Sequence, residues 1–451
     1  MAARPDDEIQ ALKALVQKDP TNVRALAALG GALQLEGRYD EAAAMADAAL
    51  AANPACAAAW LVLGDSRFNA GRPDLAAEAY SRATTDPGAG VLALVRLGGS
   101  YRALGRFEEA LRALDAAAAL DPAAALARYQ RGVLRLSLRD FAAGWADYEA
   151  RWQTERFVEV SRGFVAPGMI PHLTLSPTAQ SVAGQRVLLV GEQGIGDQIM
   201  FASMIPDLAS SAASVVCACE PRLRGLFEAA FPQVAFVHPS GAQVEADVLL
   251  AMGSLGSAFR PNEASFPGGP YLKASEGARE RWEARLGPQS GKLRVGLSWR
   301  GGTAATRNRA RSIDLANLAP VLDLPGCELV SLQYGEVTQE IEAANAGRAN
   351  PIRHFDDGTM RDFDELSGLI ANLDVVVSVQ TAVVHLAGAL GRPCLALLPT
   401  DPEWRYLARG ETMPWYGSVR LLRQTTAGDW TAVVEQAAAA LARRAARPAA
   451  G

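Results

Sequence analysis

The clearest structural signal in the chain is RVLLVGEQGIGDQIMFASMI, residues 186–205. A short apolar run over 186–191 ends in glycine and is followed by a helix pattern, an order that is typical of a βαβ unit in a parallel sheet. Gly194 and Gly196 in the connecting turn permit a close approach of the backbone to a ligand. Asp197 lies at or just before the helix N-terminus, where the helix dipole stabilises a negative charge, and helix capping alone would also account for it.

Strand patterns continue on the C-terminal side of this stretch and form two sets. Helical or loop stretches separate most of them, which indicates two doubly wound, Rossmann-like α/β halves in tandem, the first over residues 184–290 and the second over 291–451. A polar helix at 277–286 closes the first half. Ligands in such sheets bind beyond the carboxyl ends of the strands, so we expect the site in the cleft between the halves. The first set lies at 186–191, 214–220, 234–238 and 247–252, and the second at 293–299, 327–333, 351–355, 374–379, 393–398 and 419–422.

The N-terminal third repeats with a period close to 34 residues. A glycine recurs at Gly30, Gly64, Gly98 and Gly132, and Asp-Pro or Asn-Pro steps close successive units. Small residues let two helices approach closely, and the residue before a proline leaves the helical region of ψ, which ends the helix. The pattern resembles the tetratricopeptide repeat (TPR) and predicts an α-solenoid over residues 1–152.

A solenoid of this kind offers a concave groove for a peptide or a helix, with a spacer or an oligomerisation arm as the alternative. Its last unit ends in the aromatic-rich segment 141–152, which we expect to dock onto the next domain. Residues 153–183 are irregular and contain several prolines, and they are predicted to be a linker packed across the second domain.

The composition excludes several classes of protein. The 451 residues include 44 Lys and Arg against 49 Asp and Glu, a net charge of −5, whereas a general nucleic-acid binder shows a basic footprint. No apolar run reaches the roughly 18 residues of a membrane span. Five cysteines are few and odd in number, which favours a reduced, cytoplasmic setting over a disulfide scaffold. Cys217 and Cys219 read as residues of a buried strand and not as zinc ligands.

Two further stretches suit phosphate binding. After the strand at 374–379, a helix starts near Thr381, and the free N–H groups of a helix start bind anions. His385 falls on the first turns of that helix, either as a ligand of the site or as a structural residue. The loop after the strand at 293–299 carries Arg300 and a run of arginines from Arg307 to Arg311, followed by Ser312, and arginines there could clamp a phosphate.

An Asp-x-Asp pattern at Asp362 and Asp364 formally suggests a metal-bound sugar nucleotide. The two acids open a helix, however, where the dipole favours them, so we predict a capping role and no metal site.

The order of these motifs resembles a known family of enzymes. The chain looks like bacterial TPR-fused glycosyltransferases of the GT-B fold, which are related to ADP-heptose heptosyltransferases and to O-GlcNAc transferases, and it is most similar to soluble flagellin glycosyltransferases. The motifs that carry the resemblance are EQGIGD (192–197), VGLSWRG (295–301), RSIDL (311–315), SLQYGE (331–336), DFDELSGLIANLD (362–374), HLAGALGRP (385–393), PEWRYL (402–407) and PWYGSVRLLRQ (414–424).

The resemblance implies a role for each motif. Asp197 matches the proposed general base, with Glu192 as the reserve base. Relatives often carry Asp at the position of Gln380, so an altered donor preference or the loss of that residue's role is implied. The residues expected to bind the donor are Gly194, Gly196, Arg300, Arg311, Ser312, Gln333, Gln380, Thr381 and His385.

We therefore predict a metal-independent, inverting protein O-glycosyltransferase without a cofactor. It would move a sugar from a nucleotide donor, such as a CMP-activated nonulosonic acid of the pseudaminic acid type, to Ser or Thr of a protein, flagellin, captured by the TPR groove. Two alternatives stay open. One is a non-catalytic adaptor or chaperone with a degenerate transferase half, and the other is a heptosyltransferase-like enzyme that acts on a glycan.

Overall fold

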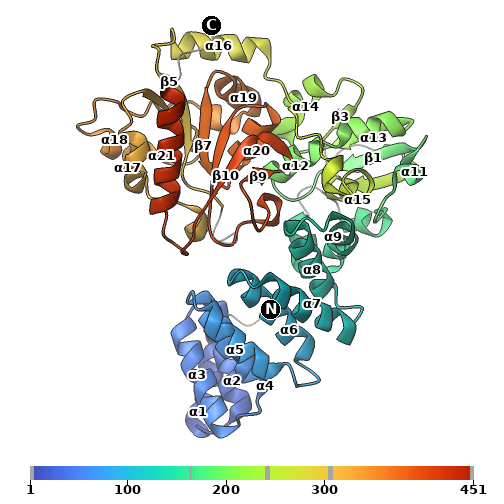
Figure 1. The fold of residues 1–451 in the computed structure, drawn as a ribbon. Coiled ribbons are helices and arrows are strands. Elements are labelled where there is room, and N and C mark those ends of the chain that lie inside the picture. The colour runs from blue at the N-terminus through green and yellow to red at the C-terminus, as the bar shows by residue number, and fades with distance from the viewer. Residues whose placement is uncertain (1–4, 162–164, 166, 239–243, 303–307, 447–451) are drawn as a thin grey trace. The chain divides into compact units, whose positions relative to one another are not determined.

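The computed structural model describes residues 5–161, 165, 167–238, 244–302 and 308–446 (Figure 1). The chain forms two compact units, Met1–Leu134 and Arg135–Gly451. No helix in these described ranges is long and apolar enough to cross a membrane.

The first unit consists of helices joined by tight turns. Gly37, Gly71 and Gly105 occupy three of the turns in the left-handed region, with φ of 71°, 77° and 70°. Glycine adopts this conformation without the steric cost that a side chain adds, and Arg139 takes the fourth position at φ 68° and bears that cost. The helices are α1 (Pro5–Lys18), α2 (Val23–Leu35), α3 (Tyr39–Ala52), α4 (Ala57–Asn69), α5 (Pro73–Ala83), α6 (Gly90–Ala103), α7 (Phe107–Leu120) and α8 (Ala125–Ser137), which runs into the second unit.

Three of the recurring glycines, Gly30, Gly64 and Gly98, lie where two helices touch, as the repeat predicts. A Cβ atom on Gly98 of α6 would lie 2.8 Å from Leu114 Cγ and 3.3 Å from the carbonyl oxygen of Ala110, both on α7. A Cβ atom on Gly64 would lie 2.4 Å from the ring of Tyr80. The small residues therefore set the distance between neighbouring helices.

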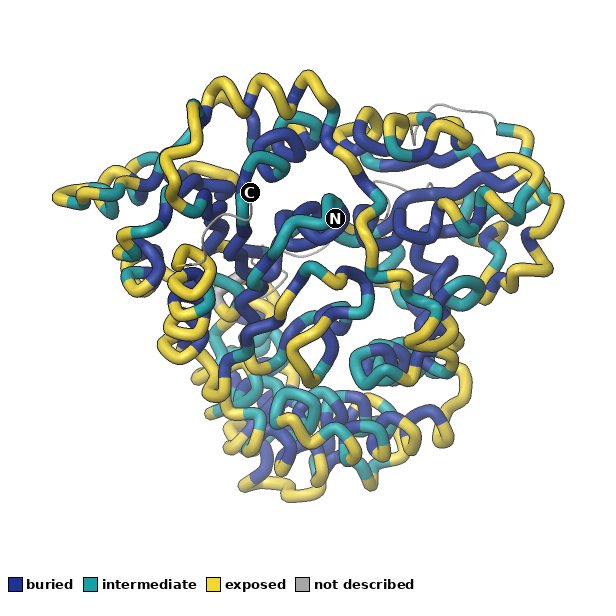
Figure 2. Tube along the Cα trace, turned by 45° about the horizontal axis from the view of Figure 1, so that its top comes forward, coloured by how far each residue is buried: buried dark blue, intermediate teal, exposed yellow. Residues whose placement is uncertain are grey.

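The second unit contains two sheets. The first is fully parallel in the order β3-β2-β1-β4. The central strand, β1, is the one that the sequence predicts at 186–191. Buried residues run through its strands, whereas α13 and α14 contain both buried and exposed residues and α12 contains no exposed residue (Figure 2). Its elements are α11 (Ala179–Val182), β1 (Arg186–Val190), α12 (Ile195–Ala202), α13 (Ile205–Ser211), β2 (Ser214–Ala218), α14 (Arg224–Ala230), β3 (Ala235–Val237), β4 (Val248–Ala251) and α15 (Leu255–Phe259).

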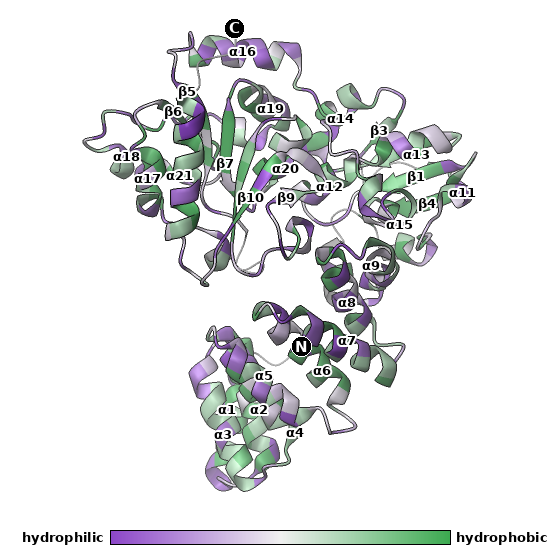
Figure 3. Cartoon of the chain, viewed as in Figure 1, coloured by the Kyte–Doolittle hydropathy of each residue, from purple (hydrophilic) through white to green (hydrophobic). Residues whose placement is uncertain are grey.

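The second sheet has the order β6-β5-β7-β8-β10-β9, and only β9 is antiparallel. The chain leaves β5 towards β6 on one side and returns to β7 on the other, which creates the crevice where such sheets bind ligands. The apolar strands stand out in Figure 3. The elements are β5 (Leu293–Ser298), α17 (Ala319–Leu322), β6 (Cys327–Ser331), α18 (Thr338–Asn345), α19 (Phe363–Ala371), β7 (Val375–Val379), α20 (Ala382–Ala389), β8 (Cys394–Leu398), β9 (Thr412–Met413), β10 (Tyr416–Arg423) and α21 (Thr431–Ala445).

Two local expectations are corrected. The segment 351–355 forms a single bridge between Arg353 and Val330 and no strand. The polar helix α16 (Glu276–Leu286) packs on α19 of the second half, because Ala278 lies against Gly368 and Ser275 donates a hydrogen bond to Asp364 (3.0 Å).

Other expectations hold. Cys217 and Cys219 are buried and free. The linker runs along the first sheet, where the Thr174 amide donates to the Leu249 carbonyl (2.9 Å). The fold class is confirmed as helical repeats followed by two α/β halves, each built on a parallel sheet.

The aromatic segment that follows α8 docks as expected. In α9 (Phe141–Tyr148), the indole N–H of Trp145 donates to the Arg260 carbonyl of the first half (2.9 Å). The same ring meets Trp404 and Trp415 of the second half edge to face, with centroids 5.6 and 6.4 Å away. One side chain therefore contacts both halves.

Adjacent glycines in α6 test the close packing of the repeats. We expect Gly98→Ala to lower the free energy of unfolding by about 1–3 kcal/mol, because the new methyl group overpacks the contact with α7. Gly99→Ala meets nothing within 4 Å and should stabilise the helix by about 0.5–1 kcal/mol. Denaturant unfolding of both variants measures the difference, and equal effects would contradict the packing role of Gly98.

Candidate active site

A pocket of about 740 Å³ opens between the two α/β halves. The first half contributes the glycine-rich turn before α12 and the loop after β2. The second half contributes the loops at the carboxyl ends of β5, β6 and β7, and the short helix η10 (Trp404–Tyr406). The lining residues are Gln193, Gly194, Ile195, Gly196, Asp197, Glu220, Arg222, Gly302, Arg311, Tyr334, Gly335, Met360, Arg361, Phe363, Gln380, Thr381, Ala382, His385, Arg405 and Tyr406.

Asp197 lies on the first turn of α12 and faces the other half. Its Oδ2 accepts a hydrogen bond from the amide of Gly194, the N-cap residue, at 3.2 Å. Its Oδ1 forms an ion pair with Arg405 of η10. Asp197 is thus both a helix cap and one half of an ion pair that joins the two halves at the pocket.

Arg405 is charged despite its burial. Burial opposes the charge, but the carboxylates of Asp197 and then Glu403 outweigh it and raise the pKa of Arg405. Its Nε atom is buried and has no hydrogen-bond partner among the described residues. Arg405 therefore contributes a positive charge to the wall of the pocket.

The start of α20 faces the same space. Thr381 is its N-cap, and the hydroxyl accepts from the amide of Val383 at 3.2 Å, as the predicted helix start requires. The side-chain oxygen of Gln380 accepts from the amide of Glu403 at 2.9 Å. The Nε2 of Gln380 is buried and lacks a partner within the described part of the chain.

Arg311 reaches the pocket from the loop after β5. It donates to the carbonyl of Gln380 at 2.7 Å and lies 3.4 Å from Glu403. A Cβ atom on Gly301 would lie 2.7 Å from that same carbonyl, so the two loops touch backbone to backbone. Of the earlier arginines of this predicted run, Arg307 lies outside the described residues.

His385 lies in a chain of hydroxyl groups that joins both halves. The Tyr271 hydroxyl donates to the carbonyl of Ile199 in α12 at 2.6 Å, so it accepts from Tyr416 at 3.3 Å. Tyr416 must then accept from His385 Nδ1 at 3.2 Å, and Tyr406 donates to Nε2 at 3.2 Å. These contacts place the proton of the neutral His385 ring on Nδ1, with Nε2 as the acceptor.

The electrostatic surroundings agree with a neutral ring. Burial, and then the charges of Arg405 and Arg311, lower the pKa of His385 well below its usual range. Gly196 makes the packing of this site possible, because a Cβ atom there would lie 3.0 Å from the His385 ring. His385 therefore lines the pocket without adding positive charge.

Glu192 is a correction to the predicted site. Its carboxylate is fully buried and forms an ion pair with Arg151 at 2.8 Å, and it accepts from the Gly253 amide at 2.6 Å. Glu192 does not line the pocket. A carboxylate held in this way cannot reach a substrate hydroxyl, so it is no reserve base.

Three predicted donor ligands brace the loops without lining the pocket. Gln333 is buried, and its side-chain oxygen accepts from the amides of Trp299 and Arg300, each at 2.8 Å. The Arg300 side chain forms an ion pair with Glu340 at 2.7 Å. Ser312 accepts from the amide of Gly301 at 3.3 Å.

The site also contains residues to which the sequence patterns assigned no role. Arg405 and Tyr406 belong to the PEWRYL motif, and the half-exposed Tyr334 belongs to SLQYGE. These motifs can be recognised in the sequence, but the sequence does not show that the three side chains line the pocket. Arg222 and Arg361 add positive charge at the rim and carry no sequence signal.

The Asp-x-Asp pattern behaves as a helix start. Asp362 is the N-cap of α19, and its carboxylate accepts from the amides of Asp364 (2.9 Å) and Glu365 (3.2 Å). Within the described residues, no group of three or more His, Cys, Asp or Glu side chains is placed to hold a metal ion.

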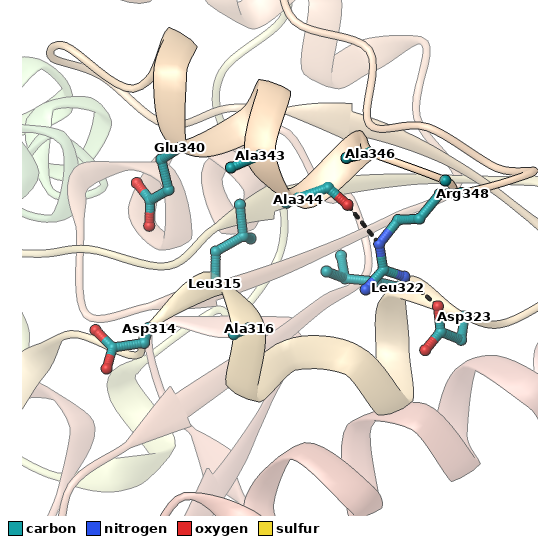
Figure 4. Close-up of a pocket in the computed structure, with 11 residues that line it drawn as sticks. Asp314, Leu315, Ala316, Leu322, Asp323, Glu340, Ala343, Ala344, Ala346 and Arg348 are labelled. Atoms are coloured by element: carbon teal, nitrogen blue, oxygen red, sulfur yellow. Dashed lines mark hydrogen bonds and ion pairs between the residues drawn. The ribbon is translucent and has the colours of Figure 1, made fainter.

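A second pocket of about 660 Å³ lies on the second half, between α17 and α18 (Figure 4). Arg348 crosses one end, donating to the Ala344 carbonyl at 2.7 Å and pairing with Asp323. Alanine and leucine side chains form much of its wall, and it shares no residue with the interlobe pocket. Asp314 and Leu315 of the RSIDL motif line it, but none of the candidate site residues does.

The buried neutral histidine predicts a pH dependence of stability. Below its unfolded pKa of about 6.5, His385 takes up a proton in the unfolded chain but not in the folded one. The free energy of unfolding should therefore fall as the pH drops from 6.5 towards the folded pKa, by up to about 1.4 kcal/mol per pH unit from this group. Urea unfolding between pH 5 and 7 measures this slope in the wild type and in His385→Gln.

We expect His385→Gln to show a shallower slope than the wild type. His172→Gln, which changes an exposed histidine, should keep the wild-type slope. Parallel slopes for the wild type and His385→Gln would mean that His385 is not held neutral.

Comparison with known proteins agrees with the architecture. Residues 33–90 and 98–138 match two families described as tetratricopeptide repeat and TPR repeat. Residues 358–426, which include α19, β7, α20 and η10, match the family described as glycosyltransferase family 9 (heptosyltransferase).

One curated relative spans most of the chain. Protein FlbA of Caulobacter vibrioides is 29% identical over 458 residues, which cover 94% of this chain and 73% of that protein.

Two solved structures are similar in part. The glycosyl transferase family 9 structure from Veillonella parvula is 10% identical, has a TM-score of 0.43, and covers 58% of this chain and 97% of its own. MamA from Desulfovibrio magneticus is 21% identical, has a TM-score of 0.30, and covers 34% of this chain and 86% of its own. Both scores are below 0.5, so the fold assignment rests on the two sheets described above. The chain thus combines tetratricopeptide repeats with a heptosyltransferase-like region of the glycosyltransferase family 9 type.

Proposed function

We propose that the chain is a protein O-glycosyltransferase, which moves a sugar from a nucleotide-sugar donor to a Ser or Thr hydroxyl of a protein held by the repeats. One observation carries the proposal: a single pocket joins the carboxylate of Asp197, on the first half, to the start of α20 and the guanidinium groups of Arg311 and Arg405 on the second. A carboxylate suits proton abstraction, and the positive groups suit a leaving phosphate.

The second half supplies the donor end of the site. The N-terminus of α20 and the side chains of Arg311 and Arg405 face the pocket together. Arginine side chains keep their positive charge at every physiological pH, and the free N–H groups of a helix start bind anions. This argues for a phosphate-bearing donor.

The reaction then follows in one displacement. The acceptor hydroxyl oxygen forms a bond to the anomeric carbon while the bond from that carbon to the leaving phosphate breaks. Asp197 takes the hydroxyl proton, and the phosphate leaves with the electron pair and is stabilised by Arg311, Arg405 and the helix dipole. Attack from the face opposite the leaving group inverts the anomeric centre, and the positive groups take the place of a metal.

The acceptor and the sugar come from the resemblance. Flagellin is the proposed acceptor, held by the TPR unit in the cytoplasm, and a CMP-activated nonulosonic acid such as pseudaminic acid is the proposed donor. Intact-mass analysis of flagellin co-expressed with the chain tests both, because the added mass identifies the class of sugar.

Asp197→Asn tests the general base. The variant keeps the size of the side chain but cannot take a proton, so we expect the turnover rate to fall about 10²–10⁴-fold with little change in donor affinity. Mass-resolved transfer to the acceptor measures the rate, and titration calorimetry measures the affinity.

Asp207→Asn is the matched control. It removes a carboxylate that forms an ion pair with the buried Arg260 at 2.8 Å, and Asp207 does not line the pocket. We expect transfer at the wild-type rate. An Asp197→Asn enzyme that glycosylates as fast as this control would refute the assignment of the base.

Gln380 supports a second candidate, an adaptor without transferase activity. The resemblance places an Asp at this position in many relatives, and an amide can neither act as a base nor repel a phosphate. Titration with CMP-, CDP-, UDP- and ADP-sugars separates the two functions. We expect one donor class to bind, and Arg311→Met to weaken that binding at least tenfold, whereas no binding across the panel would favour the adaptor.

A further inference from the structure

The turn that carries Asp197 contains one residue in an unfavourable backbone conformation. Gln193 has φ of 61°, in the left-handed region that residues with side chains avoid. It lies directly before Gly194, the N-cap of α12, and it lines the interlobe pocket. A glycine would adopt this φ without strain, so the side chain of Gln193 must add something that glycine lacks.

That side chain is held from outside the α/β halves. Its Nε2 donates to the Tyr148 hydroxyl at 2.7 Å and also lies 3.3 Å from Glu192. Glu192 is in turn fixed by two hydrogen bonds from Arg151, at 2.8 and 2.9 Å. Both residues that precede the N-cap are therefore held by the segment at the end of α9.

Tyr148 is itself rigidly placed. It is fully buried, and the Arg151 guanidinium lies 4.4 Å from its ring centroid. Its ring packs edge to face with Trp145 and Trp404, with both centroids 5.6 Å away. Trp404 directly precedes Arg405, so Tyr148 contacts the supports of both partners in the ion pair of Asp197.

We propose that Tyr148 and Gln193 are a pair of positioning residues for the reaction. The Tyr148 hydroxyl holds the Gln193 amide, which keeps the turn in its left-handed conformation and fixes where α12 begins. The start of α12 sets the place of Asp197 in the pocket. The effect on turnover rests on the proposed function, whereas the effect on the turn does not.

The charges around Gln193 agree with a positioning role. Arg151 forms ion pairs with both Glu192 and Glu149 beside it, and the amide of Gln193 carries no charge of its own. The hydrogen bond to Tyr148 therefore orients the turn without altering the charge near Asp197.

The test uses Tyr148→Phe and Gln193→Gly in the full chain. Each removes the hydrogen bond; the first keeps the ring packing, and the second also relieves the backbone strain. We expect amide hydrogen exchange over residues 191–198 to become about fivefold faster, the effect of one lost hydrogen bond. The melting temperature of Gln193→Gly should equal or exceed that of the wild type.

Kinetics separate positioning from a general loss of structure. With the donor and acceptor of the wild type, we expect kcat to fall about fivefold in both variants while the KM for the donor stays the same, because the second half binds the donor. Tyr80→Phe is the control for exchange: it removes a buried hydroxyl that donates to Asp65 at 2.6 Å in the first unit, and it should leave exchange over 191–198 unchanged.

The proposal is overturned if neither variant changes exchange over 191–198. It is also overturned if exchange rises equally throughout both sheets, which would show a loss of global stability only. If the wild type transfers no sugar from any donor, the proposed function fails while the exchange result still decides whether the pair positions the turn.

Discussion

The contact between α12 and α20 is the constraint on which the site depends. Gly196 brings the start of one helix against His385 and Ala382 of the other, and the ion pair of Asp197 with Arg405 closes the same interface. Ligand groups from two sheets share one pocket only because these helix starts approach so closely. Any larger residue at position 196 would push against the His385 ring.

The polar network around this contact is directional. The Ile199 carbonyl of α12 accepts from the Tyr271 hydroxyl, which in turn accepts from the Tyr416 hydroxyl. Tyr416 must therefore accept from Nδ1 of His385, which fixes the tautomer of that ring. A neutral ring next to two guanidinium groups leaves the positive charge of the pocket on arginines, which keep it at every physiological pH. The positive charge of this part of the pocket is thus insensitive to modest changes in pH.

The end of the repeat region is part of the transferase core. Trp145 fills the space above Gly256 and contacts both halves, and Arg151 forms a buried ion pair with Glu192. Removing one partner of a buried ion pair leaves the other charge uncompensated, which lowers the stability of the folded state. A cut at the end of α9 would leave this pair in place, but it would remove Trp145 and Tyr148, and with them the contacts to Trp404 and to the Gln193 side chain.

The sequence alone determined the repeats, the two α/β halves and the glycine-rich turn, because these depend on local periodicity and on the spacing of glycine and proline. It also located Asp197, Thr381 and Arg311 at strand ends, where parallel topology gathers residues. Long-range packing decided the rest. Glu192 lies next to the predicted base in the chain but is drawn into the core by Arg151, and Gln333 and Arg300 turn towards the loops they brace. Arg405 and Tyr148 reach the site from distant segments, and no pattern near them in the chain records which side chain they will meet.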